Sequence, residues 1–408
     1  MKEGWITKEI NTACEVEYGT RVVRKRDGGT IYPVYGGGGA TFFMDTYNRE
    51  DALVIARFAM SEECTRFVEG KFFLNDSGLT VTPKNADEIL PEFLNLQMLF
   101  LNDYIYSLSR GAAQRNLNVP AFRKTLINYP ESLDEQHRIV SILDHCFEAI
   151  DKAKANAEQN LRNAKELFES YLQGVFDAKK SDDCGWIKNR LEELGVITSS
   201  KRIYKREYVE NGIPFYRTKE VKELAHNREI SLELFISRER YEEIKNAFGV
   251  PQIGDLLISA VGTIGEILVI KDAQEFYFKD GNIIWLKDFH NIDTDYLKYA
   301  LTAFVEKIKS LAIGSAYSAL TIEKLKLYEI AFPETIEKQQ KIVQKLDALQ
   351  AESLKLQSHY QNKIDDLEEL KKSILQKAFA GELNTEKMVE ETPLAPISES
   401  VCCEAEKI

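Results

Sequence analysis

Two long stretches of the chain carry apolar residues at alternating spacings of about three and four, which is the pattern of a coiled-coil helix. The stretches are 131–180 and 334–381, and neither contains a proline. Each predicted helix of about 44 residues would span roughly 65 Å at about 1.5 Å per residue. Ser353 and Lys371 weaken the second apolar series. The expected core positions are Ile139, Leu143, Ile150, Leu161 and Phe168 in the first helix, and Ile342, Leu346, Leu349, Leu356, Ile364, Leu367 and Ile374 in the second.

A helix of this length with a single apolar stripe is unstable on its own, so each of the two needs a partner. The first helix leads from one block of the chain into the next, and the second helix follows the second block. This order favours antiparallel pairing of the two helices with each other. Pairing of each helix with another protein remains the alternative.

The remaining blocks, 1–130 and 181–333, have the mixed pattern of small α/β domains. Each block contains β-type apolar runs bounded by glycine turns, and then a helical run. These runs fall at 52–58, 72–81 and 91–109 in the first block, and at 255–270, 276–286 and 295–312 in the second. The pattern therefore predicts an α+β fold in which two mixed α/β globular domains are joined by two long antiparallel coiled-coil helices.

An internal repeat relates the two halves of the chain. Residues 107–176 match 310–379 at a constant offset of 203, with 20 identities in 70 positions and no gap. At an offset of 181, Trp5 aligns with Trp186 and Tyr35 with Tyr216. The change of offset places about 22 additional residues between Tyr216 and Gly314. The chain is therefore a tandem duplication, and its halves are expected to be related by pseudo-two-fold symmetry.

The net charge of −12 is unusual for a protein that binds nucleic acid, but the acidity is unevenly distributed. Residues 1–130 carry 15 basic and 16 acidic side chains, and residues 185–333 carry 21 and 22. The excess of acidic residues lies in the connecting segments and in 382–408, which is expected to be a disordered acidic tail. No apolar run of about 18 residues occurs, so no membrane span is expected and a cytoplasmic protein is predicted.

The motifs of common catalytic centres are not found. The chain has no G-x-x-x-x-G-K-[ST] phosphate loop, no N-P-P-Y-like tetrapeptide and no C-x-x-C pair. Its histidines are scattered, and His137 aligns with Gln340 in the repeat, which argues against a catalytic pair. We therefore expect neither catalysis nor a metal site in this chain.

Basic clusters are the stronger signal. RVVRKR (21–26) and KRIYKR (201–206) occupy the same place in both copies, and YPVYGGGG (32–39) and IPFYRTKEV (213–221) follow them. Cations beside loops with tyrosine and polar residues suit phosphate contacts and the reading of base edges. These loops are the candidate reading segments, and Arg217 and Lys219 are candidates for contact with a guanine edge. A solvated charged face is the simpler explanation for either run alone.

Taken together, the motifs resemble those of the specificity subunits of type I DNA restriction–modification systems. The resemblance covers 4–381 and rests on the two tryptophans and the segments YPVYG and IPFYR. It also rests on a signature that occurs twice. That signature is GAAQRNLN (111–118) with Pro130 and DEQHRIVSILD (134–144), and GSAYSALT (314–321) with Pro333 and EKQQKIVQKLD (337–347). Block one departs from the pattern, since it has RFAMSEEC (57–64) where block two has the glycine-rich VGTIGE (261–266).

The resemblance implies a non-catalytic, sequence-specific DNA-binding subunit. Its target recognition domains, 1–130 and 181–333, would each read one half of a bipartite asymmetric site in double-stranded DNA. The helices 131–180 and 334–381 would set the spacing and dock two methyltransferase subunits, and restriction/translocase subunits would join the complex. S-adenosylmethionine, ATP and Mg would be bound by those partners and not by this chain.

A coiled-coil scaffold without DNA readout is the alternative function, although it would not need aligned basic runs. The residues expected to contact DNA are Arg21, Arg24, Lys25, Arg26, Tyr35, Gln114, Arg115, Lys201, Arg202, Lys205, Arg206, Tyr216, Arg217, Lys219, Ser315 and Tyr317.

Overall fold

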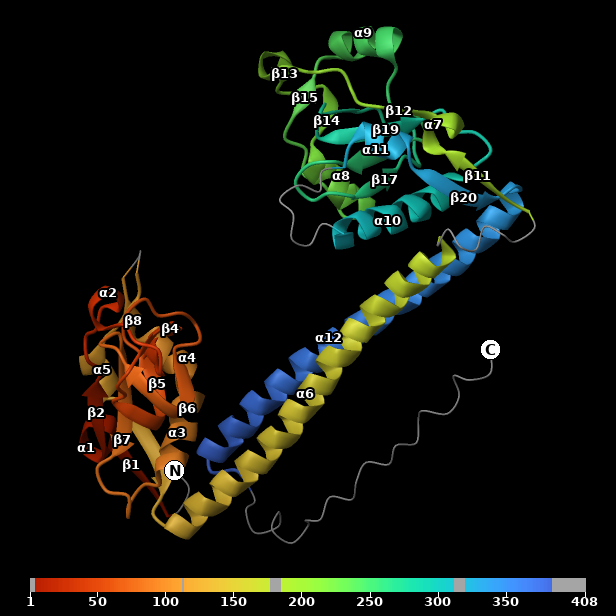
Figure 1. Cartoon of the computed structure of the whole chain (residues 1–408). Helices are drawn as coiled ribbons and strands as arrows, with labels where there is room; N and C mark the ends of the chain where they lie inside the picture. Colours follow the sequence, from red (N-terminus) through yellow and green to blue (C-terminus); the bar gives the residue numbers. More distant parts are fainter. Residues whose placement is uncertain (1–3, 112–113, 177–184, 312–319, 384–408) are drawn as a thin grey trace. The chain divides into compact units, whose positions relative to one another are not determined.

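The computed structural model describes residues 4–111, 114–176, 185–311 and 320–383, except for the side chains of 307–311 (Figure 1). Its contacts divide the chain into two compact units. Unit 1 combines Met1–Glu158 with the chain from Gln361 onwards, and unit 2 is Gln159–Tyr360. Each unit therefore consists of one globular block and part of each long helix.

Unit 1 is built on a six-stranded sheet that is covered by helices α3 and α4. In spatial order the strands are β2 (Cys14–Tyr18), β7 (Gly78–Pro83), β5 (Arg49–Ala56), β6 (Thr65–Leu74), β3 (Tyr32–Gly36) and β4 (Gly39–Met44). The helices are α1 (Ile10–Ala13), α2 (Arg24–Asp27), α3 (Pro91–Phe100), α4 (Asn102–Ser107) and α5 (Val119–Arg123), and β8 (Ser109–Arg110) pairs with β9 (Asn116–Leu117). Apolar residues of the sheet and of α3 form one buried cluster with the start of the first long helix.

Unit 2 has two four-stranded sheets where unit 1 has one sheet. The first is β12 (Val196–Thr198), β19 (Ile283–Lys287), β16 (Leu256–Ser259) and β17 (Ile267–Val269), and the second is β13 (Tyr208–Val209), β15 (Phe235–Ile236), β14 (Ile213–Tyr216) and β18 (Tyr277–Phe278). The helices are α7 (Leu191–Leu194), α8 (Thr218–Ala225), α9 (Arg238–Phe248), α10 (Thr294–Leu311) and α11 (Ile322–Lys326).

The same strand pair precedes each long helix. In unit 1, β1 (Trp5–Glu9) pairs with β10 (Leu126–Pro130), so that Trp5 lies opposite Pro130. In unit 2, β11 (Trp186–Arg190) pairs with β20 (Glu329–Pro333), and Trp186 lies opposite Pro333. The two offsets of the sequence repeat therefore meet in one structural element, which confirms the tandem duplication.

A parallel strand pair locates the additional residues of block two. Tyr35 of β3 lies opposite Leu74 of β6, and Tyr216 of β14 lies opposite Phe278 of β18. Between β3 and β5, unit 1 has only the strand β4, whereas unit 2 has α8, β15 and α9 between β14 and β16. The additional residues of unit 2 therefore lie between the end of β14 and Tyr277, where β18 begins.

The long helices are α6 (Leu133–Val175) and α12 (Ile336–Phe379). In unit 1, Asp151 contacts Lys371 at 3.0 Å and Lys154 contacts Glu368 at 2.7 Å. In unit 2, Ser353 contacts Ala164. Residue numbers rise along one helix as they fall along the other, so the helices pair within the chain in antiparallel orientation, as the sequence predicts.

A buried glutamine fixes the start of each helix. The Gln136 side chain accepts from the Leu90 N–H at 2.9 Å and donates to the carbonyls of Glu88 and Pro130. Gln339 makes the same three bonds with Asp293, Asn291 and Pro333, and its bond to the Asp293 N–H is 2.7 Å long. This identity of the sequence repeat is therefore structural, since it satisfies backbone groups that are buried at the joint.

Most predicted core positions face the helix pair. Ile139, Leu143, Ile150, Leu346 and Ile364 are buried, while Leu161, Phe168, Ile342, Leu349, Leu367 and Ile374 are half-buried. Leu356 was wrongly assigned, because it is 37 % exposed. The buried position in this turn is Ser353, whose hydroxyl lies against the Ala164 backbone.

Candidate nucleic-acid interface

In unit 1 the turn from Leu74 to Gly78 gathers the ends of several strands. The Asn75 N–H donates to the carbonyl of Tyr35 at 2.8 Å, and the Thr20 N–H donates to that of Leu74 at 2.9 Å. The N–H of Arg57, which follows β5, donates to the Ser77 carbonyl at 2.8 Å. We call this turn the hub of unit 1, because the loops that follow β2, β3 and β5 all attach to it.

The basic run 21–26 is held at this hub. The Asn75 side-chain amide donates to the carbonyl of Val22, and the Asp27 carboxylate accepts from the N–H of Val23, the residue before the short helix α2. Arg21, Arg24, Lys25 and Arg26 are all exposed. Hydrogen bonding between Arg26 and Asp27 lowers the pKa of Asp27. The run is thus an exposed basic surface at a fixed point of the fold, which suits contacts with phosphates.

Arg66, on β6, and Arg115, just before β9, are further basic residues of unit 1. The Arg66 guanidinium donates to the Gly37 carbonyl at 3.1 Å, so it braces the glycine-rich turn between β3 and β4. Gln114 and Arg115 are exposed, and the Arg115 guanidinium lies 5.0 Å from the centre of the Tyr106 ring. The Arg115 carbonyl accepts from the Met60 N–H at 2.9 Å, which joins this segment to the loop that follows β5.

Unit 2 has an equivalent hub in the turn from Phe278 to Asn282. The Lys279 N–H donates to the carbonyl of Tyr216 at 2.9 Å, which repeats the bond between Asn75 and Tyr35. The Ala260 N–H donates to the Asn282 carbonyl at 2.8 Å. From the sequence, these segments are predicted only to be turns between β-strands. The signal that this prediction missed is that Asp76 and Asp280 occupy the same place in the two hubs.

The second basic run also lies at its hub. Arg202 forms an ion pair of 2.8 Å with Asp280, and the Lys201 N–H donates to the Tyr277 hydroxyl at 2.7 Å. Lys205 and Arg206 are exposed on a 3-10 helix (Lys205–Glu207). The aligned basic runs of the sequence therefore occupy equivalent structural positions in both units.

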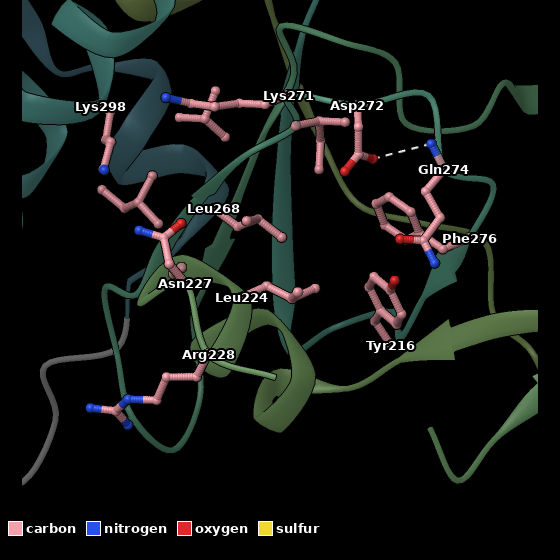
Figure 2. A pocket seen from close by; sticks show the side chains of 14 residues that line it. Tyr216, Leu224, Asn227, Arg228, Leu268, Lys271, Asp272, Gln274, Phe276 and Lys298 are labelled. Atoms are coloured by element: carbon pink, nitrogen blue, oxygen red, sulfur yellow. Dashed lines mark hydrogen bonds between the residues drawn. The ribbon is translucent and has the colours of Figure 1, made fainter. Parts of the chain in front are cut away.

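The sequence predicts that Tyr216 contacts DNA, but the structure places this residue in the core. Its side chain is 2 % exposed, and its ring stacks on Phe276 with a centroid distance of 4.4 Å. Figure 2 shows both rings in the lining of a pocket of about 320 Å³, with Leu224 and Leu268. Burial raises the pKa of Tyr216 to about 12. The equivalent Tyr35 is half-buried, and its ring packs edge-on against Phe72 at 5.5 Å.

Arg217 and Lys219 are engaged in ion pairs with glutamates of unit 2. Arg217 contacts Glu220 at 2.6 Å and Glu233 at 2.8 Å, and Lys219 contacts Glu233 at 3.1 Å. The Glu220 carboxylate also accepts from the Arg217 N–H at 2.7 Å, which caps the start of α8. Arg217 therefore has a structural role at the start of the helix, and its contact with guanine stays a prediction.

The predicted reading loops are regular structure in both units. Residues 32–36 form β3 and residues 213–216 form β14, while Thr218–Ala225 is the helix α8. Val34, Ile213 and Phe215 are buried, and these apolar side chains draw the segments into the core. Of the other predicted contacts, Ser315 and Tyr317 lie outside the described residues.

Within the described ranges, no group of three or more His, Cys, Asp or Glu side chains could hold a metal ion. Over the same ranges, no helix is both long and apolar enough to cross a membrane.

Comparison with known proteins agrees with this architecture. The sequence matches the model of the type I restriction modification DNA specificity domain over residues 2–160 and 184–366. It is 26 % identical to a type I restriction enzyme specificity subunit of Haemophilus influenzae, over 77 % of this chain and 79 % of that protein. It is 23 % identical to the EcoBI specificity subunit of Escherichia coli, over 72 % of this chain and 66 % of that protein.

Two solved structures share the fold. A chain from a structural study of complex assembly and conformational transition in the type I R-M system aligns with a TM-score of 0.73 and 20 % identity, over 94 % of this chain and 99 % of that one. The HsdS subunit of Thermoanaerobacter tengcongensis aligns with a TM-score of 0.54 and 20 % identity, over 94 % and 98 %. Because the family match extends through both blocks, this protein belongs to the family of type I restriction modification DNA specificity domains.

Proposed function

We propose that this chain is the DNA sequence-specificity subunit of a type I restriction–modification complex. In this proposal each unit reads one half of a bipartite, asymmetric site in double-stranded DNA, and α6 and α12 set the distance between the halves. The observation that carries the proposal is the recurrence of an exposed basic run at the hub of each unit. A coiled-coil scaffold for protein partners alone would not need this recurrence.

The chemistry of the complex would lie in partner subunits. Two methyltransferase subunits would dock on the long helices, and restriction/translocase subunits would join them. S-adenosylmethionine, ATP and Mg would be bound by these partners. The support for this division of labour is the family membership, because the specificity subunits that resemble this chain are described by their role in recognition. We propose a cytoplasmic location for the complex, where it would meet DNA.

The charge of the chain bears on how it would bind DNA. The blocks are close to neutral and the whole chain carries −12. Non-specific affinity for DNA arises mainly from neutralised phosphates, so the chain alone should bind weakly. Tight binding would then require basic surface from the methyltransferase partners.

A gel-shift series with and without the methyltransferase partner tests this proposal, together with mapping of methylated sites in host DNA. We expect a bipartite methylated motif that disappears when the gene is deleted, and a specific shift only with the partner. Exchange of residues 1–106 for another block should change one half of the motif only. Methylation that persists at the same motif without the gene would contradict the proposal.

A further inference from the structure

Arg57 in unit 1 is held in an arrangement that none of the predicted contacts has. Its guanidinium lies over two aromatic rings, 4.7 Å from the centre of the Tyr18 ring and 4.4 Å from that of Phe58. One of its nitrogens donates to the Asp76 carbonyl in the hub at 3.3 Å. Tyr18 is 43 % exposed and Arg57 is half-buried, so this group lies at the surface. The N–H groups of the guanidinium that do not bond to Asp76 are its route to a further partner.

The backbone around Arg57 is equally constrained. Its N–H donates to the Ser77 carbonyl at 2.8 Å, and its carbonyl accepts from the Leu117 N–H at 2.9 Å. Two residues later, Ala59 has a φ of +48°, a conformation that a residue with a Cβ rarely adopts. Strained backbone of this kind persists where the surroundings impose it, and it is enriched at functional sites.

The corresponding turn of unit 2 has no such side chain. Residues 260–266 form a glycine turn in which Gly262 and Gly265 have φ values of +81° and +90°. A Cβ on Gly265 would lie 2.2 Å from a Val305 methyl group, so the turn packs too closely for a side chain there. The braced arginine therefore belongs to unit 1 alone, in the segment RFAMSEEC that departs from the family pattern.

From this arrangement we infer that Arg57 is a base-reading residue of unit 1, which recognises a guanine in the half-site of that unit. The inference rests on the proposed function. An arginine fixed on aromatic faces has already lost most of its conformational freedom, so it can offer two parallel N–H donors to the O6 and N7 of guanine at little further cost. Arg21, Arg24 and Lys25 are exposed on the same surface and are not braced in this way, which suits phosphates.

The first test compares Arg57→Lys and Arg57→Ala with Arg24→Ala in cells that contain the methyltransferase partner, by mapping the methylated motif. Lysine keeps the charge but not the paired donors. Both Arg57 variants should relax one guanine position of one half-site by roughly 5- to 150-fold in base preference. Arg24→Ala should weaken methylation uniformly and leave the motif intact. Phe58→Leu, which removes one of the two rings, should give an intermediate relaxation.

The main outcome of the second test is read from the unaltered complex, so it does not depend on the folding of a variant. In binding assays, each guanine of the unit 1 half-site is replaced by 7-deazaguanine, which lacks the N7 acceptor. One replacement should weaken binding by the wild-type complex, and the same replacement should have no effect on the Arg57→Lys complex. A half-site without guanine, or one in which no replacement matters, would overturn the role of Arg57. Absence of any motif in the wild type would instead overturn the proposed function.

Discussion

The hydroxyl of Ser353 donates a hydrogen bond of 2.7 Å to the backbone carbonyl of Ala164 on the facing helix. A serine at a core position is usually a weakness in a coiled coil, but here it lies where the two helices approach closely enough for a side chain to reach the partner's backbone. The hydrogen bond between Ser353 and the backbone of the small residue Ala164 therefore helps to fix the register of the two helices at this position.

Substitution of Ser353 tests this register. Ser353→Leu should lower the free energy of unfolding by about 1–3 kcal/mol, because the added atoms have no space against Ala164. Leu356→Ser should lower it by less, about 1 kcal/mol or below, since Leu356 is 37 % exposed. Urea unfolding followed by circular dichroism would measure both. The opposite order of effects would restore Leu356 to the core.

Gln339 and its sequence neighbour Gln340 should differ in how much their substitution by leucine destabilises unit 2. Gln339→Leu leaves the Asp293 N–H and the carbonyls of Asn291 and Pro333 without their partner, so it should cost about 2–4 kcal/mol. Gln340→Leu is the control, because Gln340 is exposed and touches only the Asp293 side chain at 3.3 Å. Hydrogen exchange at the Asp293 amide should accelerate in the first variant alone. Equal exchange in both variants would mean that the joint does not depend on this clamp.

The lowered pKa of Glu220 leads us to expect that unit 2 loses stability in acid. Burial favours the protonated form, but the bonds from the Arg217 side chain and N–H outweigh it, and the pKa of Glu220 lies below the ordinary 4.5. A lowered pKa stabilises the folded state above pH 4.5, and this contribution is lost as the pH falls through the folded pKa. Thermal melts should therefore show a steep loss of stability below about pH 4.5.

The variant Glu220→Gln should be less stable than the wild type at neutral pH and should lose less on acidification. Glu229→Gln, an exposed residue just after the same helix, is the matched control and should behave as the wild type. If Glu220→Gln kept the full acid-induced loss, another carboxylate would be responsible.

Asp280 restrains one of the cations at the second hub. Its carboxylate contacts Arg202 at 2.8 Å, and a DNA phosphate would have to compete with it. Asp280→Asn should therefore strengthen DNA binding by the complex, and the plot of log affinity against log salt should become steeper by up to about 0.9 for one added phosphate contact.

Asp288→Asn is the control for that measurement, because it changes the charge equally at an exposed residue of unit 2 with positive φ, whose own ion pair, with Lys287, is longer at 3.6 Å. Asparagine tolerates that conformation as aspartate does. Fluorescence anisotropy at several salt concentrations would compare the two variants. Equal gains in affinity would show that only net charge matters and that the ion pair with Arg202 is irrelevant to DNA.

The sequence predicts the architecture of this protein well and its interface only in part. The helix pair and the duplication follow from periodicity and from repeated identities such as Gln136 and Gln339, because both reflect local rules that the fold obeys. The burial of Tyr216 and the ion pairs of Arg217 depend on Phe276 and Glu233, which are distant in sequence. Likewise, nothing adjacent to Arg57 indicates that Tyr18 and Asp76 would hold it.

The last turn of α12 has a consequence for how the protein is made. Phe379 packs against Phe93 and Phe100 in the core of unit 1, each with a centroid distance of 5.3 Å. Of the two blocks, the one that a ribosome synthesises first therefore lacks part of its core until the end of α12 has emerged. Unit 2 is continuous in sequence, so it can complete its core earlier. The block that begins the chain should thus be the later of the two to reach its full stability.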